Sequence, residues 1–110
     1  MQELKIRQKC EDMIHYGYAA LRQFPKSERY TMAADIKKSM YRLLALIIAA
    51  NKRYHKKTTF QEMDIELDFL RSLIRLAMQL GFLPFKKYEN WAAMLNEIGR
   101  MLGGWLKSLR

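Results

Sequence analysis

The sequence has few residues that interrupt helices and few that could form cross-links or metal sites. Only five of its 110 residues are glycine and two are proline. It contains a single cysteine, Cys10, so a disulfide within the chain is excluded and we expect a buried structural thiol. Neither Cys10 nor the two histidines, His15 and His55, fall into a spacing typical of metal ligands. These absences point away from disulfide-stabilised and metal-stabilised domains.

The sequence also lacks a long uninterrupted apolar run. Its opening stretch, MQELKIRQKCED, alternates charged and apolar residues, unlike the apolar core of a secretory signal peptide, so we expect a cytoplasmic protein. The most apolar stretch, residues 43–50, supplies eight residues before Asn51 and a basic cluster interrupt it. A membrane span needs about 20 such residues. We therefore expect a buried helical segment there and no membrane anchor.

What the sequence does contain is typical of a helical domain. Leu, Met, Ala, Lys, Arg and Glu are abundant, and all are strong helix formers. Breaks in the pattern divide the chain into four predicted helices, at about residues 2–24, 28–54, 60–80 and 85–108. The short links between them favour antiparallel neighbours. We predict an all-α fold, in which residues 1–110 form one domain, an antiparallel up-down-up-down four-helix bundle.

Each predicted helix carries one apolar stripe that we expect to form the core. The stripes are Ile6, Cys10, Met13, Gly17, Leu21 and Phe24; Ile36, Met40, Leu43, Ile47 and Tyr54; Met63, Leu67, Leu70, Ile74 and Ala77; and Trp91, Leu95, Ile98, Leu102, Trp105 and Leu109. A glycine inside a helix costs about 1 kcal/mol relative to alanine. Gly17 therefore predicts either the close approach of a neighbouring helix, which we favour, or a local kink, and Gly99 and Gly103 predict a face where helices approach closely.

The second and third predicted helices are apolar over more than one face. Leu44, Leu46 and Ile48 widen the apolar arc of the second helix. The third helix has a second apolar stripe, formed by Phe69, Leu73, Leu76 and Leu80. A helix that is apolar on several sides must be covered on several sides, and one bundle core covers only part of it. From these two surfaces we predict five residues at an interface between subunits of a homo-oligomer: Leu44, Leu46, Ile48, Phe69 and Leu73.

Polar residues near the helix ends suggest how the helices begin and end. Ser27 is a predicted N-cap of the second helix, and Thr59 and Glu62 match the capping-box pattern at the start of the third. We assign the acidic residues of the third helix, Glu66 among them, to stabilisation by the helix dipole. Gly81 and the proline that follows it give that helix its stop.

Positive charge is concentrated in one part of the chain. The formal net charge is +9, and residues 25–57 contain nine Lys and Arg against two acidic residues. Binding of cations to phosphates releases counterions, so we expect a nucleic-acid partner, RNA first and DNA second. No base-reading motif is present, which favours contacts to the backbone and shape of the nucleic acid. The candidate binding residues are Lys37, Lys38, Arg42, Lys52, Arg53, Lys56 and Lys57.

Two other interpretations of the basic surface remain open, and an enzyme is not expected. The charge could serve only the solvation of a structural oligomer, or it could hold the protein at an anionic membrane surface. Candidates for catalysis are limited to His15, His55, Cys10 and the carboxylates of the third helix, and no glycine-rich phosphate loop is present. We predict no catalytic residue, no cofactor and no metal ion.

The order of these segments resembles a known family. The stretches YAALRQFPKSERYTMAADIKKSMYRLLALIIAANKRYHK, FQEMDIELDFLRSLIRLAMQLGFL and KYENWAAMLNEIGRMLGGWLKS are similar to the accessory variability determinant (Avd) proteins of diversity-generating retroelements. They also resemble the wider four-helix proteins encoded in intervening sequences of bacterial ribosomal RNA genes. The similarity covers residues 16–108, and the ending EIGRMLGGWLKS favours the Avd branch.

The resemblance implies a function that the residues alone do not. It implies a bacterial or phage protein that forms a basic, barrel-like pentamer and has no catalytic activity of its own. Such a protein binds a reverse transcriptase and nucleic acid, and supports the adenine-directed, error-prone copying of a template RNA into cDNA. The intervening-sequence branch implies the same fold and oligomer, as a basic structural or RNA-binding protein without a reverse transcriptase. Neither branch says which basic residues contact the polymerase and which contact RNA.

Overall fold

The computed structural model describes residues 2–109 and contains four long helices. The elements are α1 (Gln2–Leu21), a short 3-10 helix η1 (Lys26–Glu28), α2 (Met32–Lys52), α3 (Lys57–Gln79) and α4 (Phe85–Ser108). No strand occurs among the described residues. The predicted all-α class and the four predicted helices are confirmed.

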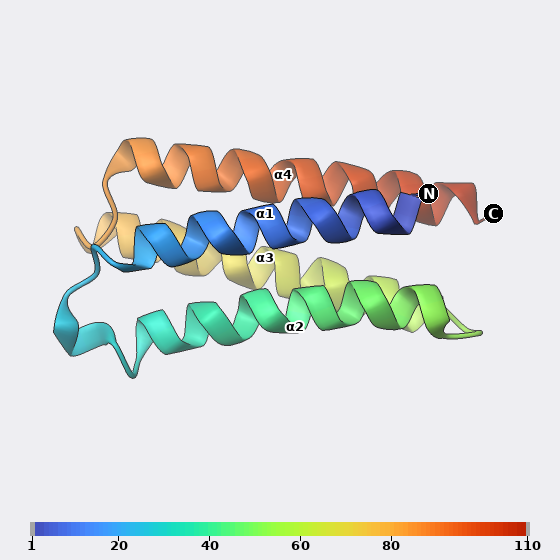
Figure 1. Cartoon of the computed structure of the whole chain (residues 1–110), viewed down its shortest axis with the longest axis horizontal. Coiled ribbons are helices and arrows are strands. Elements are labelled where there is room, and N and C mark those ends of the chain that lie inside the picture. Colours follow the sequence, from blue (N-terminus) through green and yellow to red (C-terminus); the bar gives the residue numbers. More distant parts are fainter. Residues whose placement is uncertain (1, 110) are drawn as a thin grey trace.

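The four helices lie side by side and alternate in direction (Figure 1). Helices that are adjacent in the sequence pack against each other, and α4 packs against α1, so each helix has two neighbours around one core. The molecule measures 44 × 24 × 19 Å. Because the helices alternate in direction, the α2–α3 loop lies at the same end of the bundle as the start of α1 and the end of α4 (Figure 1).

The core consists of the predicted apolar stripes, with two exceptions. Every residue of the four stripes is buried except Tyr54 and Leu109. α2 ends at Lys52 and α4 ends at Ser108, so both exceptions lie beyond the helix whose periodicity placed them in the core. The prediction that Tyr54 belongs to the core face of the second helix was wrong.

One glycine lies at the tightest crossing in the core. A Cβ atom built on Gly17 would lie 2.6 Å from Met40 Sδ and 2.8 Å from Trp91 Cζ2. The Trp91 indole N–H also donates to the sulfur of Met13 at 3.4 Å, which gives this buried polar group a partner. The predicted close approach at Gly17 is confirmed, because only a hydrogen fits between α1 and its two neighbours.

The predicted start of the second helix was wrong. The predicted cap, Ser27, belongs to η1, and α2 begins only at Met32. Within η1 the amide of Glu28 donates to Pro25 O and that of Arg29 to Lys26 O, so these amides already have backbone partners and need no cap.

The predicted capping box of the third helix was also wrong. α3 begins at Lys57, so Thr59 lies inside its first turn and is buried. The hydroxyl of Thr59 accepts a hydrogen bond from Arg53 Nη1 at 2.7 Å instead of capping an amide. The other end of α3 agrees with the prediction, because Gly81 adopts a φ of 83° directly after the helix, a conformation that favours glycine.

Candidate nucleic-acid interface

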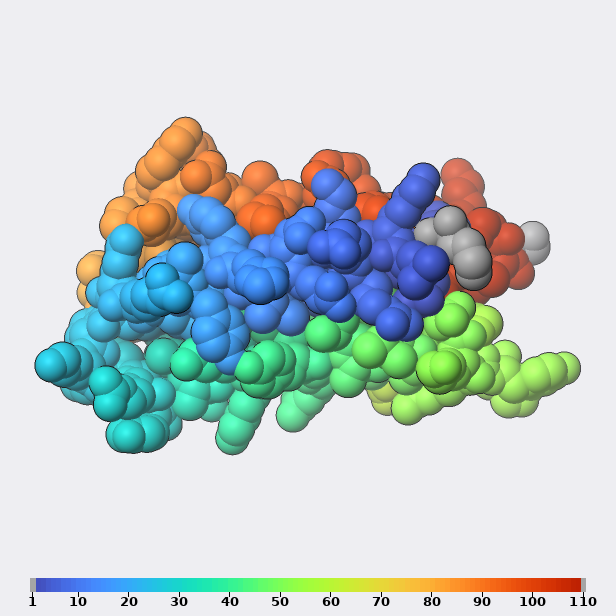
Figure 2. Space-filling model, viewed as in Figure 1, coloured from blue at the N-terminus to red at the C-terminus, as the bar shows by residue number. Residues whose placement is uncertain are grey.

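The seven predicted binding residues form two groups, one along α2 and one around the α2–α3 loop, from the last residue of α2 to the first residue of α3. The helix group comprises Lys37, Lys38 and Arg42, and the loop group comprises Lys52, Arg53, Lys56 and Lys57. Fourteen positions separate Lys38 from Lys52, which corresponds to about 21 Å along a helix. The loop itself projects from the end of the bundle (Figure 2). The contacts within each group decide which cations remain available to a ligand.

Lys56 is committed to holding the end of α2. Its ammonium donates to the carbonyl oxygens of Ala50 at 2.6 Å and Arg53 at 2.8 Å, and lies 3.5 Å from that of Asn51. The last carbonyls of a helix have no partner within the helix, and they form the negative end of its dipole. Lys56 therefore satisfies these carbonyls, and its ammonium group is engaged at the end of α2.

Arg53 fastens the loop to α3. Besides the bond to Thr59, its guanidinium lies 3.8 Å from the Glu62 carboxylate. Together with Lys56, this arginine connects both ends of the loop to the helices that flank it. Two of the four cations in the loop group thus have structural contacts, a division that no pattern in the sequence indicates.

Lys52 and Lys57 are the loop cations that remain open. Both are exposed, and neither forms an ion pair with a carboxylate among residues 2–109. Between them lies Tyr54, which is 91% exposed and contacts His55 edge to face at 4.8 Å. The loop therefore presents two cations and an exposed aromatic ring on a backbone that is held in place.

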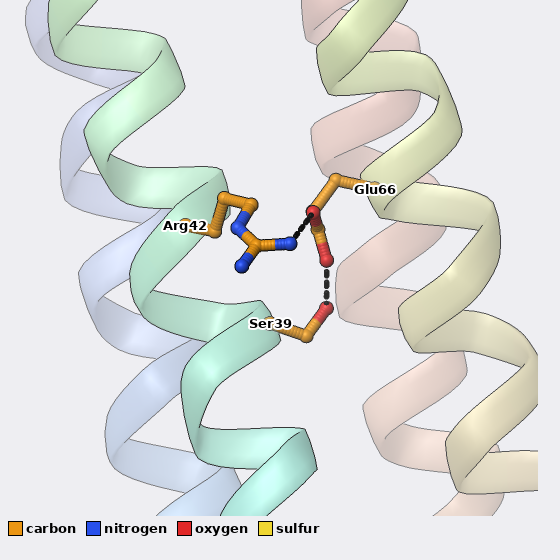
Figure 3. A network of polar contacts seen from close by, with 3 residues as sticks. All are labelled: Ser39, Arg42 and Glu66. Carbon is orange, nitrogen blue, oxygen red and sulfur yellow. Dashed lines mark hydrogen bonds and ion pairs between the residues drawn. The ribbon is translucent and has the colours of Figure 1, made fainter.

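The helix group takes part in a network of polar contacts around one buried carboxylate (Figure 3). Glu66 of α3 is buried, and its carboxylate accepts a 2.6 Å hydrogen bond from Ser39 and lies 3.5 Å from Arg42 Nη1. Buried carboxylates are stable only when they are paired in this way. Glu66 therefore joins α3 to α2, a role that the assignment to the helix dipole missed. Arg42 is exposed but is directed towards this carboxylate.

Of the two lysines in the helix group, Lys37 has a contact within the chain, whereas Lys38 remains available to a ligand. The Lys37 ammonium lies 4.8 Å from the ring centroid of Tyr18 in a cation–π contact. The Tyr18 and Tyr41 hydroxyls are hydrogen-bonded to each other, and this bond raises the pKa of Tyr18. Lys38 is exposed and has no carboxylate partner among the described residues. Lys38 is thus the open cation of the helix group.

A groove of about 800 Å³ lies between α3 and α4, directly below the loop. Its wall is mainly apolar and includes Phe60 and Leu106, while Tyr54 and Lys57 line it on the loop side. A Cβ atom built on Gly103 would meet no atom within 4 Å, so the predicted close approach at this glycine was wrong. The same prediction for Gly99 is confirmed, because a Cβ atom built there would lie 3.2 Å from Leu67 and 2.8 Å from the Arg71 guanidinium.

The five predicted interface residues lie on α2 and α3 with unequal exposure. Leu44, Leu46 and Leu73 are half-buried against the core of the same chain, and Ile48 is half-buried as well. Phe69 is 49% exposed. Three further apolar side chains on the outer side of α3 are exposed: Ile65, Leu76 and Leu80.

The candidates for catalysis are not gathered into a site. Burial, with a smaller contribution from the charge of Glu11, raises the pKa of Cys10 to about 12, so its thiol stays protonated at neutral pH. His15 is exposed on α1, far along the chain from the loop residue His55. Within residues 2–109, no three His, Cys, Asp or Glu side chains are placed to hold a metal ion. Over the same range, no helix combines the length and apolar content that crossing a bilayer requires.

Comparison with known proteins adds one finding to this geometry. A family model described as bAvd-like matches residues 4–109, a range that includes all four helices apart from the first two residues of α1. The chain matches no curated protein. The matched range also includes every residue of the two basic groups.

Proposed function

The chain belongs to the bAvd-like family, and from this premise we propose that it is a non-enzymatic accessory protein of a diversity-generating retroelement. In this role it binds the element's reverse transcriptase and nucleic acid, the template RNA and its cDNA. The single observation that carries the proposal is the family match over residues 4–109. The concentration of positive charge in residues 25–57 supports the nucleic-acid part.

The contribution of the protein to copying is binding and positioning. Lys38, Lys52 and Lys57 are exposed cations without carboxylate partners among the described residues, which suits contacts with phosphates. Contacts of this kind carry no sequence information, so the choice of template is left to the partner and to the RNA itself. The protein holds RNA and polymerase together while the polymerase carries out the error-prone copying and retrohoming follows.

We propose further that the protein works as a homo-oligomer, a pentameric ring. Exposed apolar side chains along the outer side of α3 support this proposal: Ile65 at 69% exposure, with Phe69, Leu76 and Leu80 further along the helix. A row of exposed apolar residues on a helix is typical of an interface. A ring would also repeat the basic groups around its axis, and this would multiply the attraction for a polyanion.

Affinity capture from the source cells tests the proposal. The tagged protein is recovered with and without nuclease treatment, and both bound proteins and bound RNA are identified. We expect a reverse transcriptase that remains bound after nuclease treatment, together with RNA that nuclease removes. Recovery of ribosomal or bulk RNA without a polymerase would contradict the accessory role and favour the second branch of the resemblance, a basic RNA-binding oligomer of the intervening-sequence type. Recovery of neither would contradict both roles.

A further inference from the structure

The α2–α3 loop holds one aromatic ring almost entirely in solvent. Tyr54 is 91% exposed, and its ring lies nearly perpendicular to that of His55, with the ring centroids 4.8 Å apart. The fold does not require an aromatic residue here, since the loop is held by Arg53 and Lys56 instead. An exposed aromatic ring among cations is the pattern by which proteins bind unpaired nucleotides, because every base has a face that can stack.

The loop is held in position before any ligand arrives. Lys56 donates to the carbonyl oxygens of Ala50 and Arg53 at the end of α2, and Arg53 bonds to Thr59 in the first turn of α3. Only a few residues separate the end of α2 from the start of α3. A segment that is already ordered loses little conformational entropy on binding, which favours affinity.

The charge around Tyr54 fits a nucleic-acid strand better than a protein surface. Lys52 and Lys57 lie two and three residues away in the sequence, on either side of Tyr54, and neither pairs with a carboxylate among residues 2–109. Successive phosphates of a strand could contact one lysine each while the base between them meets the ring. Tyr54 and Lys57 also line the groove between α3 and α4, whose volume of about 800 Å³ leaves room beside the ring.

We propose that the α2–α3 loop binds an unpaired nucleotide of a single-stranded RNA, with the base stacked on Tyr54 and the flanking phosphates at Lys52 and Lys57. Arg53 and Lys56 do not contact the ligand in this arrangement but hold the loop. The inference rests on the proposed nucleic-acid binding. It adds that Tyr54 takes part in this binding and that single strands are preferred to duplexes. Since the bases of a duplex are already stacked on each other, single strands bind this loop more tightly than duplexes.

The test compares three variants in binding assays with a fluorescently labelled single-stranded RNA of mixed sequence and with its duplex. Base–aromatic stacking contributes about 1–3 kcal/mol per base, so Tyr54→Ala should weaken single-strand binding about fivefold or more. Tyr54→Phe keeps the ring and should bind as the wild type does. The matched control is Tyr30→Ala, because Tyr30 is 84% exposed and belongs to the segment between η1 and α2, which lies at the end of the bundle opposite the α2–α3 loop (Figure 1). This control should leave binding unchanged.

The possible outcomes separate this inference from the function on which it rests. No RNA binding by the wild type at physiological salt would overturn both. Binding that is equal for single strands and duplexes, and unchanged in Tyr54→Ala, would overturn the stacking site and leave the general RNA-binding function intact. Failure of Tyr54→Ala to capture the protein partner, with RNA affinity unchanged, would instead assign the loop to protein docking. Circular dichroism of each variant confirms that the helices remain folded.

Discussion

Two glycines mark two contrasting regions of the molecule. In the packed core, Gly17 lies between Met40 and Trp91 with no space for even a methyl group. At the loop–groove end, which comprises the α2–α3 loop and the groove between α3 and α4, Gly103 faces open space. Both were expected to serve close helix packing. A glycine in a helix therefore does not by itself indicate close packing, because Gly17 contacts two neighbouring helices whereas Gly103 borders a groove.

Neighbouring lysines give the same lesson at the loop–groove end. Lys56 and Lys57 are adjacent in the sequence, yet one holds the last carbonyls of α2 and the other is exposed without a carboxylate partner in the described part of the chain. Counting positive charges therefore overestimates the number of cations available to a polyanion. The core is determined by close packing, whereas the loop–groove end presents exposed groups. This contrast leads to four predictions.

The largest expected effect is the difference in the free energy of unfolding between substitution of a core aromatic residue and substitution of an exposed one. Trp91 is fully buried, so Trp91→Ala should lower the free energy of unfolding by about 3–5 kcal/mol. Tyr54→Ala removes an exposed ring and should change it by less than about 0.5 kcal/mol. Urea denaturation followed by circular dichroism measures both values. Similar decreases for the two variants would mean that the loop packs against the bundle.

The second prediction places leucine at both glycines. Gly17→Leu forces a side chain against Met40 and Trp91, and overpacking of this kind costs about 1–3 kcal/mol or more. Gly103→Leu enters the open groove and removes a helical glycine, so the free energy of unfolding should rise by about 0.5–1 kcal/mol. The same denaturation assay should therefore show a lower free energy of unfolding for the Gly17 variant and a higher one for the Gly103 variant. A decrease in stability at Gly103 would show that the groove is closed in solution.

The third prediction concerns pH and the buried thiol of Cys10. Its pKa is raised to about 12 in the folded protein, whereas the thiol of the unfolded chain ionises near its ordinary pKa of 9.0. The neutral thiol therefore contributes stability that is fully present below about pH 9 and disappears as the pH rises towards 12. The free energy of unfolding of the wild type, measured relative to that of Cys10→Ala, should fall by about 1.4 kcal/mol per pH unit in this window. A difference that stays constant throughout this window would contradict burial of the thiol.

The smallest expected effect is the difference in the free energy of unfolding between alanine variants of the two adjacent lysines. Lys56→Ala leaves the terminal carbonyls of α2 without their ammonium partner and should cost about 1 kcal/mol. Lys57→Ala should leave the free energy of unfolding within about 0.5 kcal/mol of the wild-type value. Thermal unfolding of the two variants side by side provides the comparison. Equal stabilities would indicate that Lys56 does not hold the loop.

The core could be predicted from the sequence because helical periodicity is a local property. Steps of three and four residues place side chains such as Ile36, Met40 and Leu43 on one face, whatever the neighbouring helix is. The periodicity fails only where the helix ends, as Tyr54 demonstrates. The prediction of α4 between residues 85 and 108 succeeded because a proline precedes its first residue.

The helix caps and the roles of individual cations could not be predicted in the same way. Ser27 matched the pattern of a cap, but the turn of η1 had already satisfied the nearby amides. Thr59 matched a capping box, but it bonds to Arg53 across the loop. These outcomes depend on where the chain turns in three dimensions. Tyr54 could have been named as a candidate binding residue from its position inside the basic cluster, because an aromatic residue is not expected at a helix end that only carries solvated charges.

The salt dependence of RNA binding tests most directly whether the open cations of the loop bind nucleic acid. The affinity of the wild type for single-stranded RNA is measured over a range of salt concentrations and compared with that of the double variant Lys52→Gln and Lys57→Gln. The slope of the logarithm of affinity against the logarithm of salt concentration falls by about 0.7 for each phosphate of a single strand that is no longer neutralised. We predict a slope smaller by about 1.4, with unchanged helicity. An unchanged slope would contradict the binding of nucleic acid by Lys52 and Lys57.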